Sequence, residues 1–453
     1  MSEFKENFVW GAATAACQIE GREANDGKGL DIWDVFCRED GKIYNGQNTD
    51  QTCMHIEHYK EDILLMKELG IKGYRMSVNW SRLFPDGTGR RNEVGFELYD
   101  QIIDELLCQG IAPYITLYHW EMPFSLYKKG GWMNPDCVQW FAEYAKSVVE
   151  HFSDRVTHYF TLNEPQCFIG LGYGNGMHAP GQKATCKELF LLAHHVMMAH
   201  GNAVQAMRSA AKQPIEIGYA PTCGVFYPET ESEQDIEAAR KMYFGCNPDA
   251  HQALWSVSWW SDPVMLGTYP EEGLKLYEKY LPNIKPEDMK LIHQPLDMYG
   301  QNIYNGIAVR AGADGNTEFV KRYDGFPRTA LDWPVTPEAL YWGPKFLYER
   351  YGKPVYITEN GMSCHDWVSL DGKVHDPNRI DFTARYLQNL KRAAGEADIA
   401  GYFHWSMMDN FEWTNGYKER FGLVYVDYPT QKRIPKDSFY WYQSVIRENG
   451  RNL

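Results

Sequence analysis

Residues 355–361 read Val-Tyr-Ile-Thr-Glu-Asn-Gly, and this stretch decides how the rest of the chain is interpreted. Strand-forming residues lead into a carboxylate, and Asn360-Gly361 then favours a turn. The pattern predicts a buried strand with Glu359 at its C-terminal end. Burying a carboxylate is costly unless a partner or a reaction uses it. A matching stretch lies upstream, where residues 159–162 run into Asn163-Glu164-Pro165.

Strand-like and helix-like segments alternate along the whole chain. The predicted strands cover residues 8–13, 73–78, 112–117, 156–162, 215–219, 297–304, 354–358 and 399–403. Apolar residues at helical spacing predict helices at 58–69, 96–107, 136–151, 189–211, 338–351, 379–394 and 439–447, with 229–295 mostly helical. We expect a loop at 14–30, and a polar hairpin with a loop insertion at 309–337.

Eight strands that alternate with helices predict a parallel sheet, and the number favours a closed (β/α)8 TIM barrel. We expect a single catalytic domain over residues 1–453, with loop insertions at the C-terminal face of the barrel. The C-terminal ends of all strands meet on that face. Glu164 and Glu359 are therefore expected to share one pocket, although 359 − 164 = 195 positions separate them in the sequence.

The composition narrows the class of protein. The chain of 453 residues has 60 acidic and 45 basic residues, for a net charge of −15, which argues against a nucleic-acid partner. The aromatic content of 15% suits the flat faces of sugars. No stretch approaches the roughly 18 uninterrupted apolar residues of a membrane span, so no membrane partner is expected.

Cysteine usage and the N-terminus predict a cytoplasmic protein. The ten cysteines are scattered, which fits a reducing compartment. The N-terminal residues are charged and lack the apolar region of a signal peptide. No Cys-x-x-Cys or His-Glu-x-x-His spacing occurs, so neither a metal nor another cofactor is expected. The sequence leaves a homo-oligomer open.

Two carboxyl groups that face each other across a pocket suit the cleavage of glycosidic bonds. One protonates the leaving oxygen, and the other attacks or activates water. Each glutamate alone could equally belong to a structural ion pair. Two of them at strand ends, each beside an asparagine, favour the catalytic interpretation.

Further motifs, in order along the chain, establish a resemblance. Residues 163–165 (Asn-Glu-Pro) and 358–361 (Thr-Glu-Asn-Gly) resemble the acid/base and nucleophile motifs of glycoside hydrolase family 1, the β-glucosidase and β-galactosidase family. Other matching segments are residues 8–14 with Gln18 and Glu20, then 74–77, 117–120, 178–181 and 405–413. The resemblance therefore covers nearly the whole chain.

The resemblance implies a retaining, exo-acting β-glucosidase that works through a covalent glycosyl-enzyme, with β-galactosides and β-fucosides as further substrates and a place in cellulose degradation. Glu359 matches the nucleophile, and Glu164 matches the acid/base. Arg75 would keep the pKa of Glu359 low, and Tyr304 would donate a hydrogen bond to it. Asn163 would donate to the 2-hydroxyl of the sugar.

The resemblance also implies a set of sugar-binding residues. They are Gln18, His119, Trp120, Asn163, Asn302, Trp405, Glu412, Trp413 and Phe421. Gln18 and His119 would hold the 3-hydroxyl side, and Trp405 would form the floor under the sugar ring. Trp413 would donate its indole N–H, and an ionised Glu412 would accept from the 4- and 6-hydroxyls. Trp120 and Asn302 could equally serve only as support.

The aglycone side departs from the family pattern. Gln166 stands where the family has tryptophan after Asn-Glu-Pro, which puts the usual aglycone preference in doubt. His178 is a further candidate on this side. Trp333 resembles the family's aglycone platform, although it could equally be an exposed loop aromatic. Residues 120–123 read Trp-Glu-Met-Pro in place of the common Trp-Asp-x-Pro.

Three alternatives remain open. A 6-phospho-β-glycosidase would replace Phe411-Glu412-Trp413 with a Ser/Lys/Tyr phosphate clamp, and Glu412 would repel a phosphate. A non-catalytic sugar-binding barrel predicts that one of the two glutamates is absent. A metal-dependent isomerase barrel would need a carboxylate and histidine cluster at several strand ends.

Overall fold

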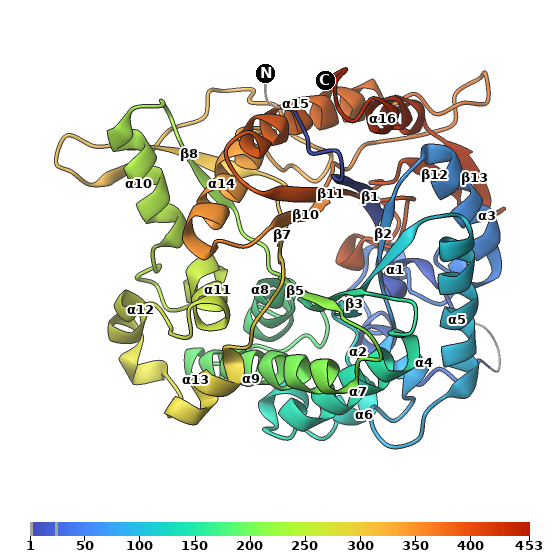
Figure 1. The fold of residues 1–453 in the computed structure, drawn as a ribbon, viewed down its shortest axis with the longest axis horizontal. Coiled ribbons are helices and arrows are strands. Elements are labelled where there is room, and N and C mark those ends of the chain that lie inside the picture. Colours follow the sequence, from blue (N-terminus) through green and yellow to red (C-terminus); the bar gives the residue numbers. More distant parts are fainter. Residues whose placement is uncertain (1–2, 23–25) are drawn as a thin grey trace.

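The computed structural model describes residues 3–22 and 26–453. Eight parallel strands form the centre of the molecule in the order β5-β4-β3-β2-β1-β11-β10-β7 (Figure 1). Their bounds are β1 Val9–Ala13, β2 Gly73–Ser77, β3 Ala112–Tyr118, β4 His158–Asn163, β5 Glu216–Ala220, β7 Tyr299–Asn302, β10 Val355–Asn360 and β11 Ile399–Trp405. The two ends meet where Asn302 N donates to Pro221 O at 3.0 Å, so the predicted (β/α)8 barrel is confirmed.

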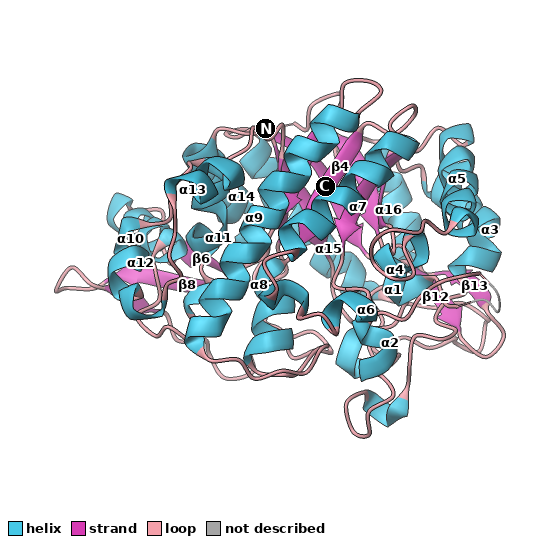
Figure 2. Cartoon of the chain, turned by 90° about the horizontal axis from the view of Figure 1, so that it is seen from below, coloured by secondary structure: helices cyan, strands magenta, loops and turns pink. Residues whose placement is uncertain are grey.

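Helices surround the barrel (Figure 2). The longer ones are α3 His55–Leu69, α5 Glu93–Cys108, α7 Cys137–Phe152, α9 Cys186–Ala210, α14 Ala339–Tyr351, α15 Pro377–Ala394 and α16 Asp437–Arg447. The mostly helical region divides into α10 Glu233–Phe244, α11 Val257–Met265, α12 Glu271–Leu276 and α13 Pro286–Ile292. In α7 the apolar positions Phe141, Ala145, Val148 and Phe152 recur at helical spacing and are buried, which is how the sequence directs one face of the helix inward.

Some of the short strands outside the barrel were not predicted. The antiparallel pair of β8 (Gly306–Ala311) and β9 (Thr317–Phe319) is the polar hairpin expected within residues 309–337, and it begins three residues earlier. Strand β6 (Val225–Pro228), which pairs in parallel with β8, was not expected. Strands β12 (Val424–Asp427) and β13 (Lys432–Pro435) form an antiparallel hairpin. These strands have only three to six residues, so their periodicity is weak. The predicted sixth strand is also shorter than expected, because it ends at Asn302.

The expected loop over residues 14–30 is partly helical. Its short helix α1 spans Ala16–Ile19, and residues 23–25 lie outside the described part of the chain. The remaining short helices are α2 Ile32–Phe36, α4 Trp80–Leu83, α6 Phe124–Tyr127 and α8 Pro165–Ile169. Within the described residues, no helix combines the length and the apolar character that crossing a membrane requires.

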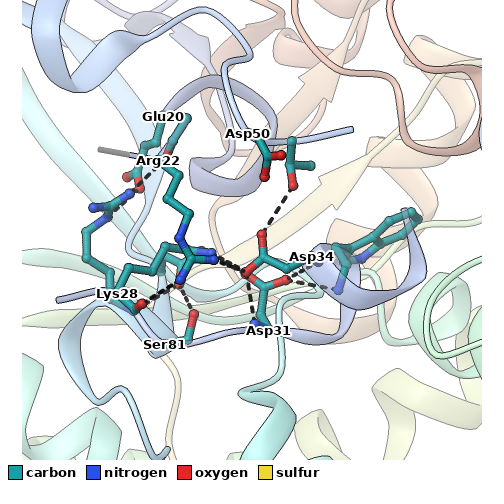
Figure 3. Close-up of polar contacts among 12 residues, drawn as sticks. Glu20, Arg22, Lys28, Asp31, Asp34, Asp50 and Ser81 are labelled. Carbon is teal, nitrogen blue, oxygen red and sulfur yellow. Dashed lines mark hydrogen bonds and ion pairs between the residues drawn. The ribbon is translucent and has the colours of Figure 1, made fainter. Parts of the chain in front are cut away.

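A buried ion cluster fixes α2 beside the barrel (Figure 3). Asp31 caps this helix by accepting hydrogen bonds from Trp33 N and Asp34 N, each at 2.9 Å. Lys28 Nζ lies 2.9 Å from Asp31 Oδ2 and 2.7 Å from Asp34 Oδ2, and the Lys28 side chain is 6% exposed. Gly29 N donates to Ser81 O, which joins this segment to α4. The cluster thereby determines where Trp33 lies.

Candidate active site

The two strand-end glutamates share one cavity. Glu359 belongs to β10, and Glu164 directly follows β4 with a left-handed backbone (φ 45°) at the start of α8. Both side chains line a cavity of about 450 Å³ at the C-terminal ends of the strands. Closure of the barrel therefore brings Glu164 and Glu359 to the same pocket, as the sequence predicted.

Glu359 is held by a cation and a hydroxyl group. Arg75 Nη1 lies 2.7 Å from Glu359 Oε1, and Tyr304 Oη donates to Glu359 Oε2 at 2.7 Å. Burial raises the pKa of Glu359 above its usual value, while Arg75 and Tyr304 lower it. This corrects the expectation of a low pKa: the arginine acts in the predicted direction, but desolvation outweighs it.

Glu164 has no such support. Its Oε1 accepts a hydrogen bond from Asn302 Nδ2 at 2.8 Å, and no cation pairs with it among the described residues. Burial and the charge of Glu359 raise the pKa of Glu164 to about 7. Because Arg75 neutralises Glu359, a proton shared by the two carboxyl groups is more stable on Glu164. The pair is therefore divided into one acid and one carboxylate.

Asn163 is the centre of a hydrogen-bond web behind the pocket. Its Oδ1 accepts from Arg75 Nη2 at 2.7 Å and from Asn302 Nδ2 at 3.0 Å. Its Nδ2 lies 3.1 Å from His119 Nε2. Burial holds the pKa of His119 well below its usual range, so the ring is neutral. If the Asn163 amide is the donor, His119 carries its proton on Nδ1, which has no hydrogen-bond partner among the described residues.

Flat rings form one wall of the cavity. The ring of His119 is nearly parallel to those of Trp405 and Trp413, at centroid distances of 5.8 and 6.0 Å. Trp120 stacks on Trp413 at 4.4 Å, and Trp33 from α2 packs behind Trp413 at 4.5 Å. The Trp120 indole also donates to Asn163 O. Such a wall matches the apolar face of a pyranose ring.

Glu412 differs from its predicted state. Burial, together with the charges of Glu359, Glu419 and Glu164, raises the pKa of Glu412 to about 8. Its Oε2 is shielded from solvent and has no hydrogen-bond partner among the described residues. The sequence led us to expect an ionised carboxylate, but at pH 7 this environment favours the neutral acid, because three carboxyl groups lie near one another with a single arginine among them.

Two predicted residues lie behind the cavity wall. Gln18 is fully buried, and its Nε2 donates to Asn410 Oδ1 at 3.1 Å and to Phe411 O at 2.8 Å. Gln166 is also fully buried, and its Oε1 accepts from Thr222 N at 3.3 Å. This corrects the expectation that Gln166 borders the leaving-group site, because its side chain does not line the cavity, whereas the next residue, Cys167, does.

The rest of the cavity lining combines predicted and unpredicted residues. His178, Trp333 and Phe421 all line it, and Trp333 is half-buried with its ring 5.1 Å from that of Tyr304. The sequence reasoning missed other lining residues, which are Cys167, Leu171, Met177, Thr222, Cys223, Gly224, Trp255, Asn305, Leu331, Thr414 and Asn415. Most of them lie in loops without a pattern. The aromatic run at 255–260 was a usable signal, but only Trp255 of that run reaches the cavity.

No metal centre accompanies the site. Over residues 3–22 and 26–453, no group of three or more histidine, cysteine, aspartate or glutamate side chains is arranged to hold a metal ion. Arg75, Asn163 and Asn302 do not line the cavity. Arg75 and Asn302 contact its carboxyl groups, and Asn163 contacts the lining residue His119. The arrangement suits general acid and nucleophilic chemistry on a neutral, ring-shaped ligand.

Comparisons with known proteins agree with this geometry. Residues 1–451 match the model of "Glycosyl hydrolase family 1". The chain is 43% identical to "Beta-glucosidase A" of Thermotoga maritima and 44% identical to "1,4-beta-D-glucan glucohydrolase" of Thermotoga neapolitana, over 99% of each chain. Its fold is similar to that of the Thermotoga maritima β-glucosidase solved with glucoimidazole, with a TM-score of 0.90, 43% identity, and coverage of 99% of this chain and 100% of that one. The chain therefore belongs to glycosyl hydrolase family 1.

Proposed function

We propose that the protein is a retaining, exo-acting β-glucosidase that removes terminal non-reducing β-D-glucosyl residues and also accepts β-galactosides and β-fucosides. One observation carries the proposal: two carboxyl groups share a cavity, and their surroundings divide them into a carboxylate, Glu359, and an acid, Glu164. This division is what the first step of a double-displacement reaction needs.

In the first step, Glu359 attacks the anomeric carbon while Glu164 protonates the oxygen of the leaving group. The bond between the anomeric carbon and that oxygen breaks, and an ester bond to Glu359 forms. Arg75 and Tyr304 hold the nucleophile in place by contacting its two oxygens separately. The ring wall around Trp405 positions the sugar.

In the second step, Glu164 acts as a base. The ester removes the negative charge of Glu359, so one cause of the raised pKa of Glu164 disappears. Glu164 then takes a proton from water while the water oxygen attacks the anomeric carbon. The ester bond to Glu359 breaks, the Glu359 carboxylate is restored, and the sugar leaves with its original configuration. A single residue thus serves as acid and then as base because its neighbour changes charge.

We assign the remaining contacts to sugar recognition. His119, Trp405, Glu412, Trp413 and Phe421 line the sugar pocket. Trp120 and Asn302 orient their neighbours, and Asn163 serves the 2-hydroxyl. Gln18 contributes to the 3-hydroxyl side through its Oε1, which has no hydrogen-bond partner among the described residues. His178, Trp333 and Cys167 form the aglycone side.

The 6-phospho-β-glycosidase alternative is disfavoured by charge. A phosphate would enter a cavity that holds the carboxylate of Glu359, and no lysine or arginine lines that cavity among the described residues. A neutral β-glycoside avoids this repulsion. The non-catalytic alternative is disfavoured because both glutamates point into the cavity.

We further propose that the protein is one cytoplasmic catalytic domain that acts on β-glucosides released from cellulose. All ten cysteines are free thiols, seven of them buried, which suits a reducing compartment. Cell fractionation tests the location, and activity on cello-oligosaccharides tests the substrate source. A homo-oligomer stays a prediction, which the mass in solution would decide.

The proposal is tested by following the hydrolysis of an aryl β-glucoside by NMR. We expect β-glucose as the first product. α-Glucose as the first product would exclude retention. A substrate panel that compares aryl β-glucosides with cellobiose then measures the preference for the leaving group. An absence of turnover on every β-glycoside would remove the proposed function.

A further inference from the structure

One buried cation joins two loops that frame the pocket. The first loop leaves β10 after Glu359, and the second leaves β11 and contains Glu412. Lys436 lies between β13 and α16, and its Nζ is 2.6 Å from Asp366 Oδ2 in the first loop and 2.7 Å from Asp409 Oδ1 in the second. The Lys436 side chain is 0% exposed and does not line the cavity. Its contacts therefore point to a role in the arrangement of the loops.

The surrounding charges are balanced. Arg379 of α15 lies 2.7 Å from Asp366 and also contacts Asp376, while Arg420 contacts Asp409. Three cations thus meet three carboxylates. Although burial raises the pKa of Asp366, Lys436 and Arg379 bring that pKa below its usual value. Asp366 therefore stays ionised near neutral pH, and its ion pairs with Lys436 and Arg379 join the two loops to the rest of the network.

The same network holds both ends of the segment 409–422. At one end Asp409 accepts from Gly422 N at 2.9 Å. At the other, Arg420 O accepts from Arg379 Nη2 at 2.8 Å and from Cys364 N at 3.0 Å. Between these anchors lie Glu412, Trp413 and Phe421, which line the cavity. The placement of these three side chains relative to Glu359 therefore depends on the network.

We propose that Lys436 is a positioning residue for sugar recognition. Its two contacts fix the segment 409–422 against the loop that follows the nucleophile, and so fix Glu412 relative to Glu359. The inference rests on the proposed function, because it requires that Glu412 accept hydrogen bonds from the 4- and 6-hydroxyls of a bound glucoside. A displacement of about 1 Å in a substrate-positioning group, caused by a change far from the reacting atoms, can lower the reaction rate on the order of 100-fold.

The chain offers a matched control in Arg433. This residue lies on β13, three positions before Lys436, and its side chain is 1% exposed. Arg433 Nε lies 2.8 Å from Asp62 Oδ1 on α3, and neither residue belongs to the two loops. Arg433→Met therefore measures the general effect of losing a buried cation, whereas Lys436→Met also removes the link between the loops.

The experiment measures kcat/KM of the full chain for an aryl β-glucoside and for its 6-deoxy analogue, at a temperature where circular dichroism shows each variant folded. For Lys436→Met we expect the value for the glucoside to fall on the order of 10- to 100-fold. The value for the 6-deoxy analogue should fall much less, so that the preference for the glucoside shrinks. In Arg433→Met, the ratio of kcat/KM for the glucoside to kcat/KM for the 6-deoxy analogue should equal that of the wild type.

A second variant guards against misfolding. Asp366→Asn removes the ion pair between Lys436 and Asp366 and leaves the pair between Lys436 and Asp409. We therefore expect the ratio of the two kcat/KM values to change in the same direction as in Lys436→Met, but by less. A wild-type ratio in both Lys436→Met and Asp366→Asn would overturn the inference while the proposed function stands. If the wild type hydrolyses neither glucoside, the proposed function fails first, and the two failures are thereby distinguished.

Discussion

The pocket and the Lys436 network both enclose carboxyl groups and cations, but in different proportions. The pocket sets three carboxyl groups against one cation: Glu164, Glu359, Glu412 and Arg75. The network sets three carboxylates against three cations: Asp366, Asp376, Asp409, Arg379, Arg420 and Lys436. Both regions withdraw charge from water, but only the network compensates each charge with a partner.

The pKa values follow this difference. Burial, together with neighbouring carboxylates that no cation fully compensates, raises the pKa of Glu164 to about 7 and that of Glu412 to about 8. In the network, the two cations beside Asp366 lower its pKa despite burial. A carboxyl group that the fold leaves uncompensated is available for proton transfer, at the expense of stability. A fully paired one contributes to structure.

The largest expected effect is in the pocket, at the nucleophile. Glu359→Gln should lower kcat for an aryl β-glucoside on the order of 10⁴-fold or more, because an amide cannot form the glycosyl ester. Steady-state kinetics on purified protein measures this. Asp376→Asn, which changes a paired carboxylate of the network in the same way, is the control and should retain far more activity. Near-normal hydrolysis by Glu359→Gln would remove its assignment.

The next effect separates activity from stability at Glu164. Glu164→Gln should lower kcat about 10²- to 10⁴-fold for substrates with poor leaving groups, and less for those with acidic leaving groups, which need no proton. The same variant should be more stable than the wild type at pH 8, by about 1–3 kcal/mol, because the folded pKa of Glu164 is above its unfolded value. Urea denaturation measures this difference, and a less stable variant would contradict it.

In the network, where the charges are paired, removing a charged group is expected to decrease stability. Arg379→Met leaves Asp366 and Asp376 buried with one cation fewer, which should reduce the free energy of unfolding by about 3–5 kcal/mol. Urea denaturation at pH 7 is the measurement. The exposed Arg385→Met, on the same helix α15, is the matched control and should change stability by less than about 1 kcal/mol. Equal losses in the free energy of unfolding of the two variants would mean that the buried ion pairs of the network add nothing to stability beyond an exposed pair.

The smallest expected effect is the dependence of kcat/KM on pH. Above a pH of about 7, kcat/KM should fall by about tenfold per unit, because Glu164 loses the proton that it must donate. The carboxylate of Asp366 should stay ionised throughout this range. The lowered folded pKa of Asp366 gives stability that is present above its unfolded pKa and is lost only as the pH falls through the folded value. A pH profile of kcat/KM that stays flat to pH 9 would contradict the assignment of Glu164.

Local sequence was sufficient for the barrel and for the two glutamates. Val355 to Thr358 form a strand because all four residues are β-branched or aromatic, and the Asn-Gly pair ends it. Once eight such strands close, Glu164 and Glu359 must meet at one face. The contacts of Arg75 and Tyr304 with Glu359 were also expected, but from the resemblance to the family and not from the local pattern.

The tertiary structure decided which carboxyl groups are ionised and which side chains are buried. Neither the neutral Glu412, nor the burial of Gln166, nor the place of Lys436 between two loops was visible in the sequence. A strand depends on neighbours along the chain, so its pattern can be read locally. Desolvation and pairing of charges depend on groups that are distant in sequence and close in space, and only the folded chain brings those groups together.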